Sequence, residues 1–312
     1  MTTAIRTISA WKLHTRTLEL GVRTQVCGIV NITPDYFSDG SLYLDPDAAV
    51  QHGLQLLDEG ADLLDLGAES TRPGSRAGSA AESAQAPAVS AAEEQARLLP
   101  VLEGILRARP EAILSVDTYK AETAQAALAA GAEIINDVSG FTWDTEMPAV
   151  CAHSGAGVVL MHTRGRPEEW RSQPQLNPDA LMAMVRDGLT ISMNTAAAAG
   201  IPPESIVLDP GYGFGKRLNE NFTLLARQVE LLALGRPLLA GLSRKSFLGH
   251  ALAPLYGGNS APTSARETAG IAALVAAILH GASIIRVHAV RPAVEAARIA
   301  DAILEAHVQV KG

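Results

Sequence analysis

Polar side chains recur at the ends of eight short apolar stretches of the chain. These residues are Asn31, the segment 69–72, Asp117, Asn136, Asp137, His162, Asp209, Ser243, Arg244, Lys245, Arg286 and His288. Side chains of these types supply hydrogen-bond donors, hydrogen-bond acceptors and charge. Strands that merely run into polar loops would not account for so many Asp, Asn, Lys and Arg residues. The set therefore favours a functional site over ordinary loop polarity.

The apolar stretches are β-prone and alternate with eight longer Ala- and Leu-rich stretches of helical character. The predicted strands cover 26–31, 62–66, 112–117, 133–137, 158–161, 205–209, 237–242 and 283–288. The predicted helices cover 46–59, 91–107, 120–130, 146–153, 179–199, 220–234, 265–280 and 292–306. Eight such units predict an α/β fold, a (β/α)8 TIM barrel, with a doubly wound open sheet as the alternative. In a barrel the carboxyl ends of the strands meet at one mouth, where active sites lie.

Two predicted connections from strand to helix are unusually long. They cover 32–45 and 67–90, and the second contains an Ala/Ser-rich stretch, 76–90, of flexible composition. Both follow strands, so both are expected at the catalytic end, where long loops often close over a site. Neither is long enough to separate domains. We expect 1–20 to be an N-terminal extension that packs on the barrel and 21–312 to be a single barrel domain.

Composition narrows the class of protein. The chain has 312 residues, 47% of them hydrophobic, which suits a large core and excludes wholesale disorder. Its formal charge of -8 and its lack of a Lys/Arg run argue against binding to nucleic acid or to a membrane surface. Cys27 and Cys151 are too few for a disulfide framework or a metal cluster, and Cys27 falls inside a predicted strand. We therefore expect a soluble cytoplasmic protein in which Cys27 is a core residue.

Several common motifs are incomplete. The glycine-rich stretch 211–216 ends in Lys216, where a dinucleotide fingerprint needs glycine, and Arg217 stands where a phosphate-binding Walker loop needs Ser or Thr. The stretch 241–245 lacks the second glycine of a nucleophile elbow. No HExxH motif and no EF-hand loop occurs in the sequence.

Eight ordered motifs resemble those of the dihydropteroate synthase family. They are GIVNITPDYFSDG (28–40), DLGAESTRPGS (65–75), SVDTYK (115–120), INDVSG (135–140), LMHTRG (160–165), LDPGYGFGK (208–216), GLSRKSFLG (241–249) and IIRVHAV (284–290). The resemblance implies a TIM-barrel transferase of folate biosynthesis. Such an enzyme condenses 6-hydroxymethyl-7,8-dihydropterin diphosphate with 4-aminobenzoate and releases pyrophosphate. It also implies Mg2+ dependence, sulfonamide sensitivity and a homodimer.

The resemblance assigns roles to individual residues. A pterin pocket is expected from Asp117, Asn136, Asp209, Lys245, Met161 and Arg286. The diphosphate site is expected from Asn31, Thr71, Arg72, Arg286 and His288, with Asn31 as the Mg2+ ligand. The aminobenzoate site is expected from Thr71, Pro73, Phe214, Ser243 and Phe37. Catalytic roles are expected for Lys245, Arg72, Asp117 and Asp39. Asp137 is rated lower as a ligand, because it could equally fix the backbone at the end of its strand.

Two other functions remain open at this point: a degenerate pterin-binding paralogue and a corrinoid-type pterin methyltransferase. The pattern also departs from the family at Ala289, where Asp is usual, and in the length of the 76–90 stretch. By strand alternation Ala289 points away from the site. The long stretch puts aminobenzoate affinity in doubt, but not the pterin residues.

Overall fold

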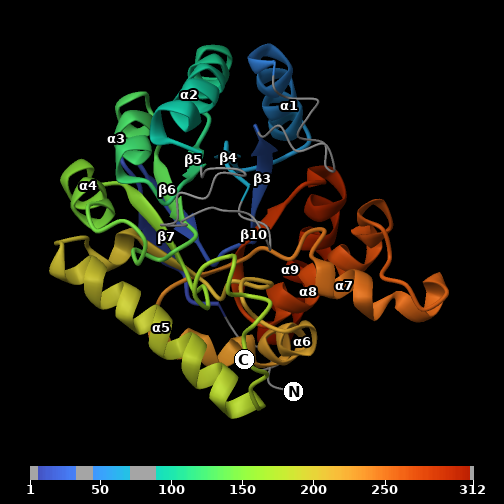
Figure 1. The fold of residues 1–312 in the computed structure, drawn as a ribbon. Coiled ribbons are helices and arrows are strands. Elements are labelled where there is room, and N and C mark those ends of the chain that lie inside the picture. Colours follow the sequence, from blue (N-terminus) through green and yellow to red (C-terminus); the bar gives the residue numbers. More distant parts are fainter. Residues whose placement is uncertain (1–5, 33–44, 71–88, 310–312) are drawn as a thin grey trace.

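The computed structural model describes residues 6–32, 45–70 and 89–309. Eight parallel strands close into a barrel in the order β10-β3-β4-β5-β6-β7-β8-β9 (Figure 1). They are β3 (Gln25–Asn31), β4 (Leu63–Gly67), β5 (Leu114–Asp117), β6 (Ile134–Asp137), β7 (Gly157–Met161), β8 (Ile206–Asp209), β9 (Leu238–Ala240) and β10 (Ala282–Val287). The predicted TIM barrel is therefore confirmed, and the open sheet is excluded.

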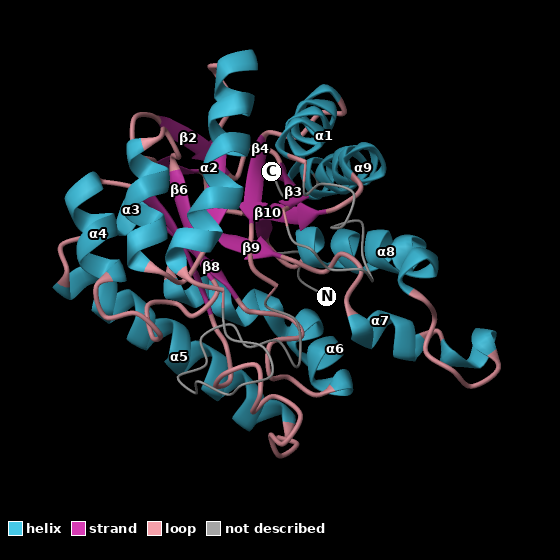
Figure 2. Cartoon of the chain, turned by 45° about the horizontal axis from the view of Figure 1, so that its top comes forward, coloured by secondary structure: helices cyan, strands magenta, loops and turns pink. Residues whose placement is uncertain are grey.

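Helices surround the strands on the outside of the barrel (Figure 2). They are α1 (Pro46–Asp58), α2 (Ala91–Ala108), α3 (Ala121–Ala129), α4 (Met147–Ser154), α5 (Pro178–Ala198), α6 (Leu218–Arg227), α7 (Ser246–Ala251), α8 (Glu267–Leu279) and α9 (Val290–Gln309). Short 3-10 segments are η2 (Pro203–Ser205), η3 (Gln228–Leu234), η4 (Ala253–Tyr256) and η5 (Thr263–Arg266). The predicted helix 220–234 is thus divided between α6 and η3, and α7 was not predicted.

Local sequence explains where several helices begin. The side chain of Ser90 accepts a hydrogen bond from the backbone N–H of Glu93 at the start of α2, and Asn177 does the same for Ala180 in α5. These caps satisfy N–H groups that have no partner within the helix. The burial of the strands on both faces comes from their nearly continuous apolar sequences, as expected for a parallel sheet between helices.

A hairpin of β1 (Ser9–Lys12) and β2 (Thr17–Leu20) precedes the barrel. Trp11 of β1 is buried and donates its indole N–H to the carbonyl of Ser205 over 2.9 Å. Trp11, Leu13 and Leu20 join an apolar cluster inside the barrel that also contains Cys27. This packing supports Cys27 as a core residue. The division of the chain at residue 20 stays a prediction.

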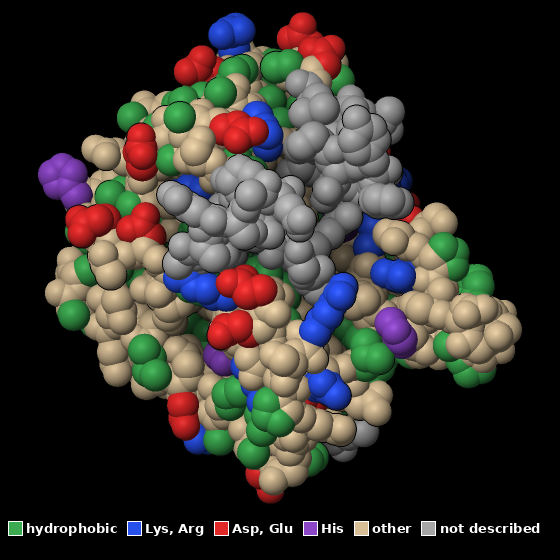
Figure 3. All heavy atoms as spheres, in the orientation of Figure 1, with side chains coloured by type: hydrophobic (Ala, Val, Ile, Leu, Met, Phe, Trp, Pro, Cys, Tyr) green, Lys and Arg blue, Asp and Glu red, His purple; other side chains and the backbone are tan. Residues whose placement is uncertain are grey.

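Charge is distributed without a dominant basic surface on the face that Figure 3 shows. Both Lys or Arg side chains and Asp or Glu side chains are visible there among the described residues. Within the same part of the chain, no helix is both long and apolar enough to cross a membrane.

Candidate active site

The register of the barrel strands brings the predicted pterin residues together. Side chains inside the barrel recur every second residue along a strand, so one interior layer follows another towards the carboxyl ends. Leu63 and Ile134 belong to the apolar interior cluster, and Asp65 and Asn136 stand two residues further on. Asp117 pairs in register with Asn136 on one side and with Gly67 on the other. The interior of the barrel therefore changes from apolar to polar just below its mouth.

One arginine links two carboxylates at this level. Arg286 donates from Nε to Asp65 Oδ2 over 2.5 Å and from Nη2 to Asp117 Oδ2 over 2.9 Å. Asp65 also accepts from Asn136 Nδ2 over 3.0 Å and from the hydroxyl of Ser115 over 2.6 Å. Asp117, Asn136 and Arg286, three residues predicted for the pterin pocket, thus lie in one hydrogen-bonded chain.

Asp65, which connects this chain, was not among the site residues predicted from the sequence. A charged side chain in an otherwise apolar strand is almost always paired when it is buried. That signal was present in the stretch Leu63–Gly67, where Asp65 is the charged residue. Sequence could not show that its partners come from β5, β6 and β10.

Electrostatics single out Asp117. Burial raises the pKa of Asp117 to about 7, although Arg286 opposes this shift; the neighbouring carboxylates of Asp65, Glu94 and Asp137 raise it further. A carboxyl group that titrates near neutrality inside a cleft is a common mark of a functional site. Its hydrogen-bonding character therefore changes within the physiological pH range.

Asp209 faces the same interior from β8. Its Oδ1 accepts the backbone N–H of Gly211 over 2.7 Å, and burial raises the pKa of its carboxyl group. Gly241 lies beside the Asp209 carboxylate: a Cβ at position 241 would be 3.9 Å from Asp209 Oδ2, and its absence leaves space there. Gly67 does the same beside Asp117, at 3.6 Å from its Cβ. These two glycines leave room beside the two carboxylates.

Lys216 is a second buried residue that the sequence analysis left without a role. Its Nζ donates to the carbonyls of His162 and Gly211, each over 2.7 Å, and burial lowers its pKa well below the ordinary value. The His162 side chain was expected at the mouth of the barrel with the other strand-end residues, but it lies elsewhere. Its ring packs against α5, where a Cβ on Gly188 would lie 2.4 Å from His162 Cδ2. His162 therefore contributes its backbone to the loop after β8.

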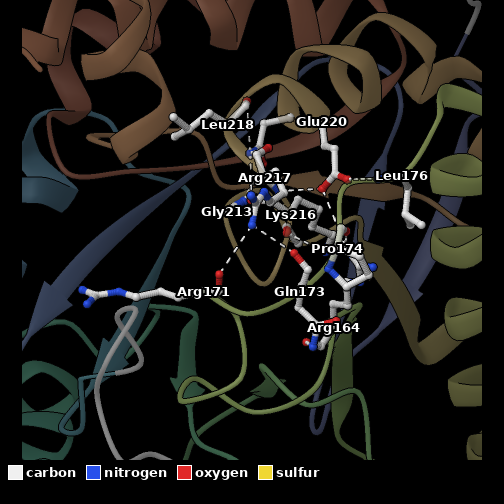
Figure 4. A network of polar contacts seen from close by, with 12 residues as sticks. Arg164, Arg171, Gln173, Pro174, Leu176, Gly213, Lys216, Arg217, Leu218 and Glu220 are labelled. Atoms are coloured by element: carbon white, nitrogen blue, oxygen red, sulfur yellow. Dashed lines mark hydrogen bonds and ion pairs between the residues drawn. The ribbon is translucent and has the colours of Figure 1, made fainter.

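The loops after β7 and β8 are joined by a polar network (Figure 4). Glu220 accepts the backbone N–H groups of Leu176 and Arg217, over 2.7 and 2.5 Å. Arg217 Nη1 reaches the carbonyl of Gln173 over 3.1 Å, and Arg164 Nη1 donates to Pro174 over 2.8 Å. This network holds the two loops against each other.

Phe214 is carried by the second of these loops. Its ring meets Trp170 edge to face with centroids 5.1 Å apart, and Lys245 Nζ lies 4.1 Å above its centroid. Phe214 also packs against a small apolar cluster of Tyr119, Val138 and Met161. The structure thus brings Phe214, Lys245 and Met161 into one wall of the mouth.

The remaining predicted residues fall into three groups. His288 Nδ1 lies 3.0 Å from the hydroxyl of Ser243, which also accepts the His288 backbone N–H over 3.3 Å. Asn31 is half-buried at the carboxyl end of β3, beside Gly67 in the register. Five predicted residues lie outside the described part of the chain: Phe37, Asp39, Thr71, Arg72 and Pro73.

Asp137 has the alternative role that the sequence analysis gave it. Its two carboxylate oxygens accept the backbone N–H groups of Ser139 and Phe141, over 2.8 and 2.9 Å. Phe141 adopts a φ of 70°, a conformation that a non-glycine residue rarely takes. Asp137 therefore fixes the turn that follows β6.

The chain is similar to known proteins in sequence and in structure. Residues 27–288 match the model of the pterin binding enzyme family. The dihydropteroate synthase of Mycobacterium leprae is 42% identical over 287 residues, which cover 92% of this chain and 96% of the relative. A crystal structure of the Yersinia pestis dihydropteroate synthase with a sulfonamide drug complex has a TM-score of 0.84 at 39% identity, covering 95% of this chain and 99% of that one. The Xanthomonas albilineans dihydropteroate synthase with 4-aminobenzoic acid has a TM-score of 0.80 at 39% identity, covering 95% and 98%.

Proposed function

The chain belongs to the dihydropteroate synthase family of pterin-binding enzymes, and from that premise we propose which of its residues perform each part of the reaction. It is a transferase of folate biosynthesis. The enzyme joins 6-hydroxymethyl-7,8-dihydropterin diphosphate to 4-aminobenzoate, forming 7,8-dihydropteroate and pyrophosphate. The observation that carries the residue assignments is the chain Asp65–Arg286–Asp117 with Asn136 below the barrel mouth.

The pterin ring is proposed to lie above this chain. Asp117 and Asp209 would accept its N–H groups, because a carboxylate takes neighbouring donors in a fork. Asn136 would supply an amide, and Met161 an apolar wall. Lys245, which lies over Phe214, would donate to the carbonyl side of the ring. All five side chains come from strand ends or from the loops that follow them.

The diphosphate is proposed to lie towards Asn31 and His288, with Arg286 contributing positive charge from below. Thr71 and Arg72 stay predictions for the same site. Within the described residues, no group of three or more His, Cys, Asp or Glu side chains could hold a metal. Mg2+ needs no such group, because it keeps several waters and takes phosphate oxygens. The amide oxygen of Asn31 fits as a single protein ligand, and bound Mg2+ would neutralise charge on the diphosphate.

The aminobenzoate is proposed to lie against Phe214, with Ser243 near its carboxylate. Phe37, Thr71 and Pro73 remain predicted contacts, and Asp39 and Arg72 predicted catalytic residues. Phe214 offers the apolar face that an aromatic acid needs, and Trp170 holds its ring in place. The network of Figure 4 supports this arrangement, since it fixes the loops that carry both aromatic residues.

The reaction breaks the bond between the pterin methylene carbon and the diphosphate oxygen, whose electron pair leaves with pyrophosphate. We propose that this cleavage precedes attack, because the dihydropterin ring delocalises positive charge from that carbon. The amine nitrogen of 4-aminobenzoate then forms the new bond and loses a proton. Asp117 and Asp209 would stabilise the cation electrostatically, and the walls of the mouth would position the amine.

Two properties of the whole protein are also proposed. Unpaired, buried Cys27 and Cys151 are consistent with a reducing, cytoplasmic location. A homodimer is supported by large exposed apolar side chains after α7, at Leu255 and Tyr256. Sedimentation equilibrium tests the dimer: a single monomeric species at micromolar concentration would contradict it.

The assignments are tested by product formation in purified variants. Lys245→Ala is expected to lose most of the activity while keeping the wild-type melting temperature. Asp209→Ala is expected to lose most of the activity and to melt somewhat lower, because it also removes the acceptor for the Gly211 backbone N–H. Asn31→Ala is expected to raise the Mg2+ concentration required for half-maximal rate. Folded variants with wild-type kinetics would refute the assignments.

The order of steps is tested without 4-aminobenzoate. Slow pyrophosphate release is expected, with solvent oxygen entering the pterin alcohol at its methylene carbon. Pyrophosphate release that strictly requires 4-aminobenzoate would contradict cleavage before attack.

A further inference from the structure

Asp65 lies deeper in the barrel than Asp117, with which it shares Arg286. Its side chain is only 1% exposed. It accepts hydrogen bonds from Ser115, Asn136 and Arg286. It also stands two residues before Gly67, the register partner of Asp117, so it lies one interior layer further from the mouth. Any influence of Asp65 on a ligand must therefore pass through the residues that it holds.

The first of these residues is Asn136. An ionised carboxylate only accepts hydrogen bonds, so the atom of Asn136 that faces Asp65 at 3.0 Å must be the NH2 group. One N–H of the amide is thereby committed to Asp65. The amide oxygen has no other partner within the described residues. Asp65 thus fixes which side of the amide a ligand meets.

The second residue is Arg286. Its guanidinium is shared between two carboxylates, through Nε to Asp65 and through Nη2 to Asp117. Without Asp65 the same positive charge would pair with Asp117 alone. A closer pairing would occupy Asp117 oxygens that a ligand needs as acceptors. Because Arg286 is shared between the two carboxylates, Asp117 keeps acceptor oxygens available for a ligand.

We propose that Asp65 is a positioning residue for pterin recognition: it orients the amide of Asn136 and restrains Arg286, so that the floor of the pocket presents acceptors to a ring edge rich in N–H donors. This inference rests on the pterin pocket proposed above. It adds a residue that need not touch the substrate, and it makes donor-rich heterocycles the class of ligand that the floor selects.

The test compares three variants with the wild type by pterin binding and steady-state kinetics. Asp65→Ala removes both contacts and is expected to weaken binding of the pterin alcohol about ten- to hundredfold, the effect of losing a buried charge-assisted hydrogen bond. The KM for 4-aminobenzoate is expected to change less than about threefold. Asp65→Asn is expected to restore most of the affinity, because its amide oxygen can accept from Asn136 and Arg286 while its NH2 group turns to Ser115. Ser115→Ala is the matched control, since it removes the third bond alone, and it is expected to bind pterin like the wild type.

A second measurement covers the case in which Asp65→Ala does not fold. Carbon-13 NMR of the Asp117 carboxyl group follows its titration among the charged groups around it, which are Arg286, Asp65, Glu94 and Asp137. Loss of the Asp65 charge in Asp65→Asn is expected to lower the pKa of Asp117, whereas Ser115→Ala leaves it unchanged.

The variants distinguish a wrong role for Asp65 from a wrong location of the pterin pocket. Equal pterin affinity in folded Asp65→Ala and wild type, equal losses in Asp65→Ala and Ser115→Ala, or an unchanged Asp117 titration in Asp65→Asn would each overturn the role of Asp65. Asp117→Asn and Asn136→Ala serve as references for the pocket itself. If these two also bind pterin normally, the pocket is misplaced, and the failure belongs to the proposed function.

Discussion

The affinity of the enzyme for its pterin substrate should depend on pH through Asp117. Burial raises the pKa of this carboxyl group to about 7, and only the ionised form accepts two N–H donors. The apparent dissociation constant then scales inversely with the ionised fraction. For a pKa near 7, binding should be about tenfold weaker at pH 6 than at pH 8, and about ninetyfold weaker at pH 5.

Isothermal titration with the pterin alcohol, which carries no diphosphate, measures this dependence without protonation of the leaving group. Asp209, whose pKa is also raised by burial, would steepen the acid limb in the same direction. Asp117→Asn is the control: it should bind weakly at pH 8 and lose the part of the dependence centred near pH 7. An affinity of the wild type that stays constant from pH 5 to 8 would refute the reasoning.

Three other substitutions test separate contacts of the site. Asp137→Asn removes an acceptor for a backbone N–H of the turn at Phe141, and urea unfolding should show a loss of about 1–3 kcal/mol; an unchanged midpoint would contradict the role of Asp137. Lys216→Met leaves the carbonyls of His162 and Gly211 without their donor. Because burial lowers the pKa of Lys216, the folded wild type binds fewer protons than the unfolded chain. The free energy of unfolding of the wild type should therefore exceed that of Lys216→Met by a margin that grows as pH rises towards 10. A margin that shrinks with rising pH would contradict this prediction. Phe214→Ala removes the ring between Trp170 and Lys245 and should raise the KM for 4-aminobenzoate about tenfold, whereas Phe222→Ala, which breaks only the pair with Phe247, should not; equal effects would refute the placement.

The barrel could be predicted from the sequence because eight apolar runs alternate with eight helical ones. Each predicted strand falls within three residues of the observed bounds, since Pro, Gly and charged residues mark the ends of buried strands. The region after α6 was harder. The stretch 220–234 has continuous helical character, yet the chain tightens into η3 after Arg227. The short helix α7 has six residues, too few for a periodic pattern to be recognised.

The position of a residue at the mouth was predictable where a motif stood at the end of a strand, as for Asp117, Asn136 and Asp209; their roles stay predictions. It was not predictable where function depends on contacts between distant strands. Asp65 and Arg286 are separated by 221 positions in the chain, and only barrel closure brings them to 2.5 Å. His162 shows the opposite failure. It ends its strand like the others, but the alternation of side chains turns it outward against α5, while Met161 faces the mouth cluster.

Thr71, Arg72 and Pro73 stay predictions from resemblance, as do Phe37 and Asp39. Ala289, which replaces the usual Asp, borders a small surface cavity of about 20 Å3 together with Ser243 and Val287. That position was expected to point away from the site.

The proposed reaction is tested most directly by dihydropteroate formation by the purified chain, followed together with pyrophosphate release in the presence of Mg2+. At saturating 4-aminobenzoate we expect one pyrophosphate for each dihydropteroate. Dihydropteroate should form only when 4-aminobenzoate is added, and folded Asp117→Ala should lose nearly all of it. An enzyme that binds the pterin diphosphate but forms no dihydropteroate would contradict the proposed reaction, and an Asp117→Ala variant that forms it at the wild-type rate would contradict the proposed pocket.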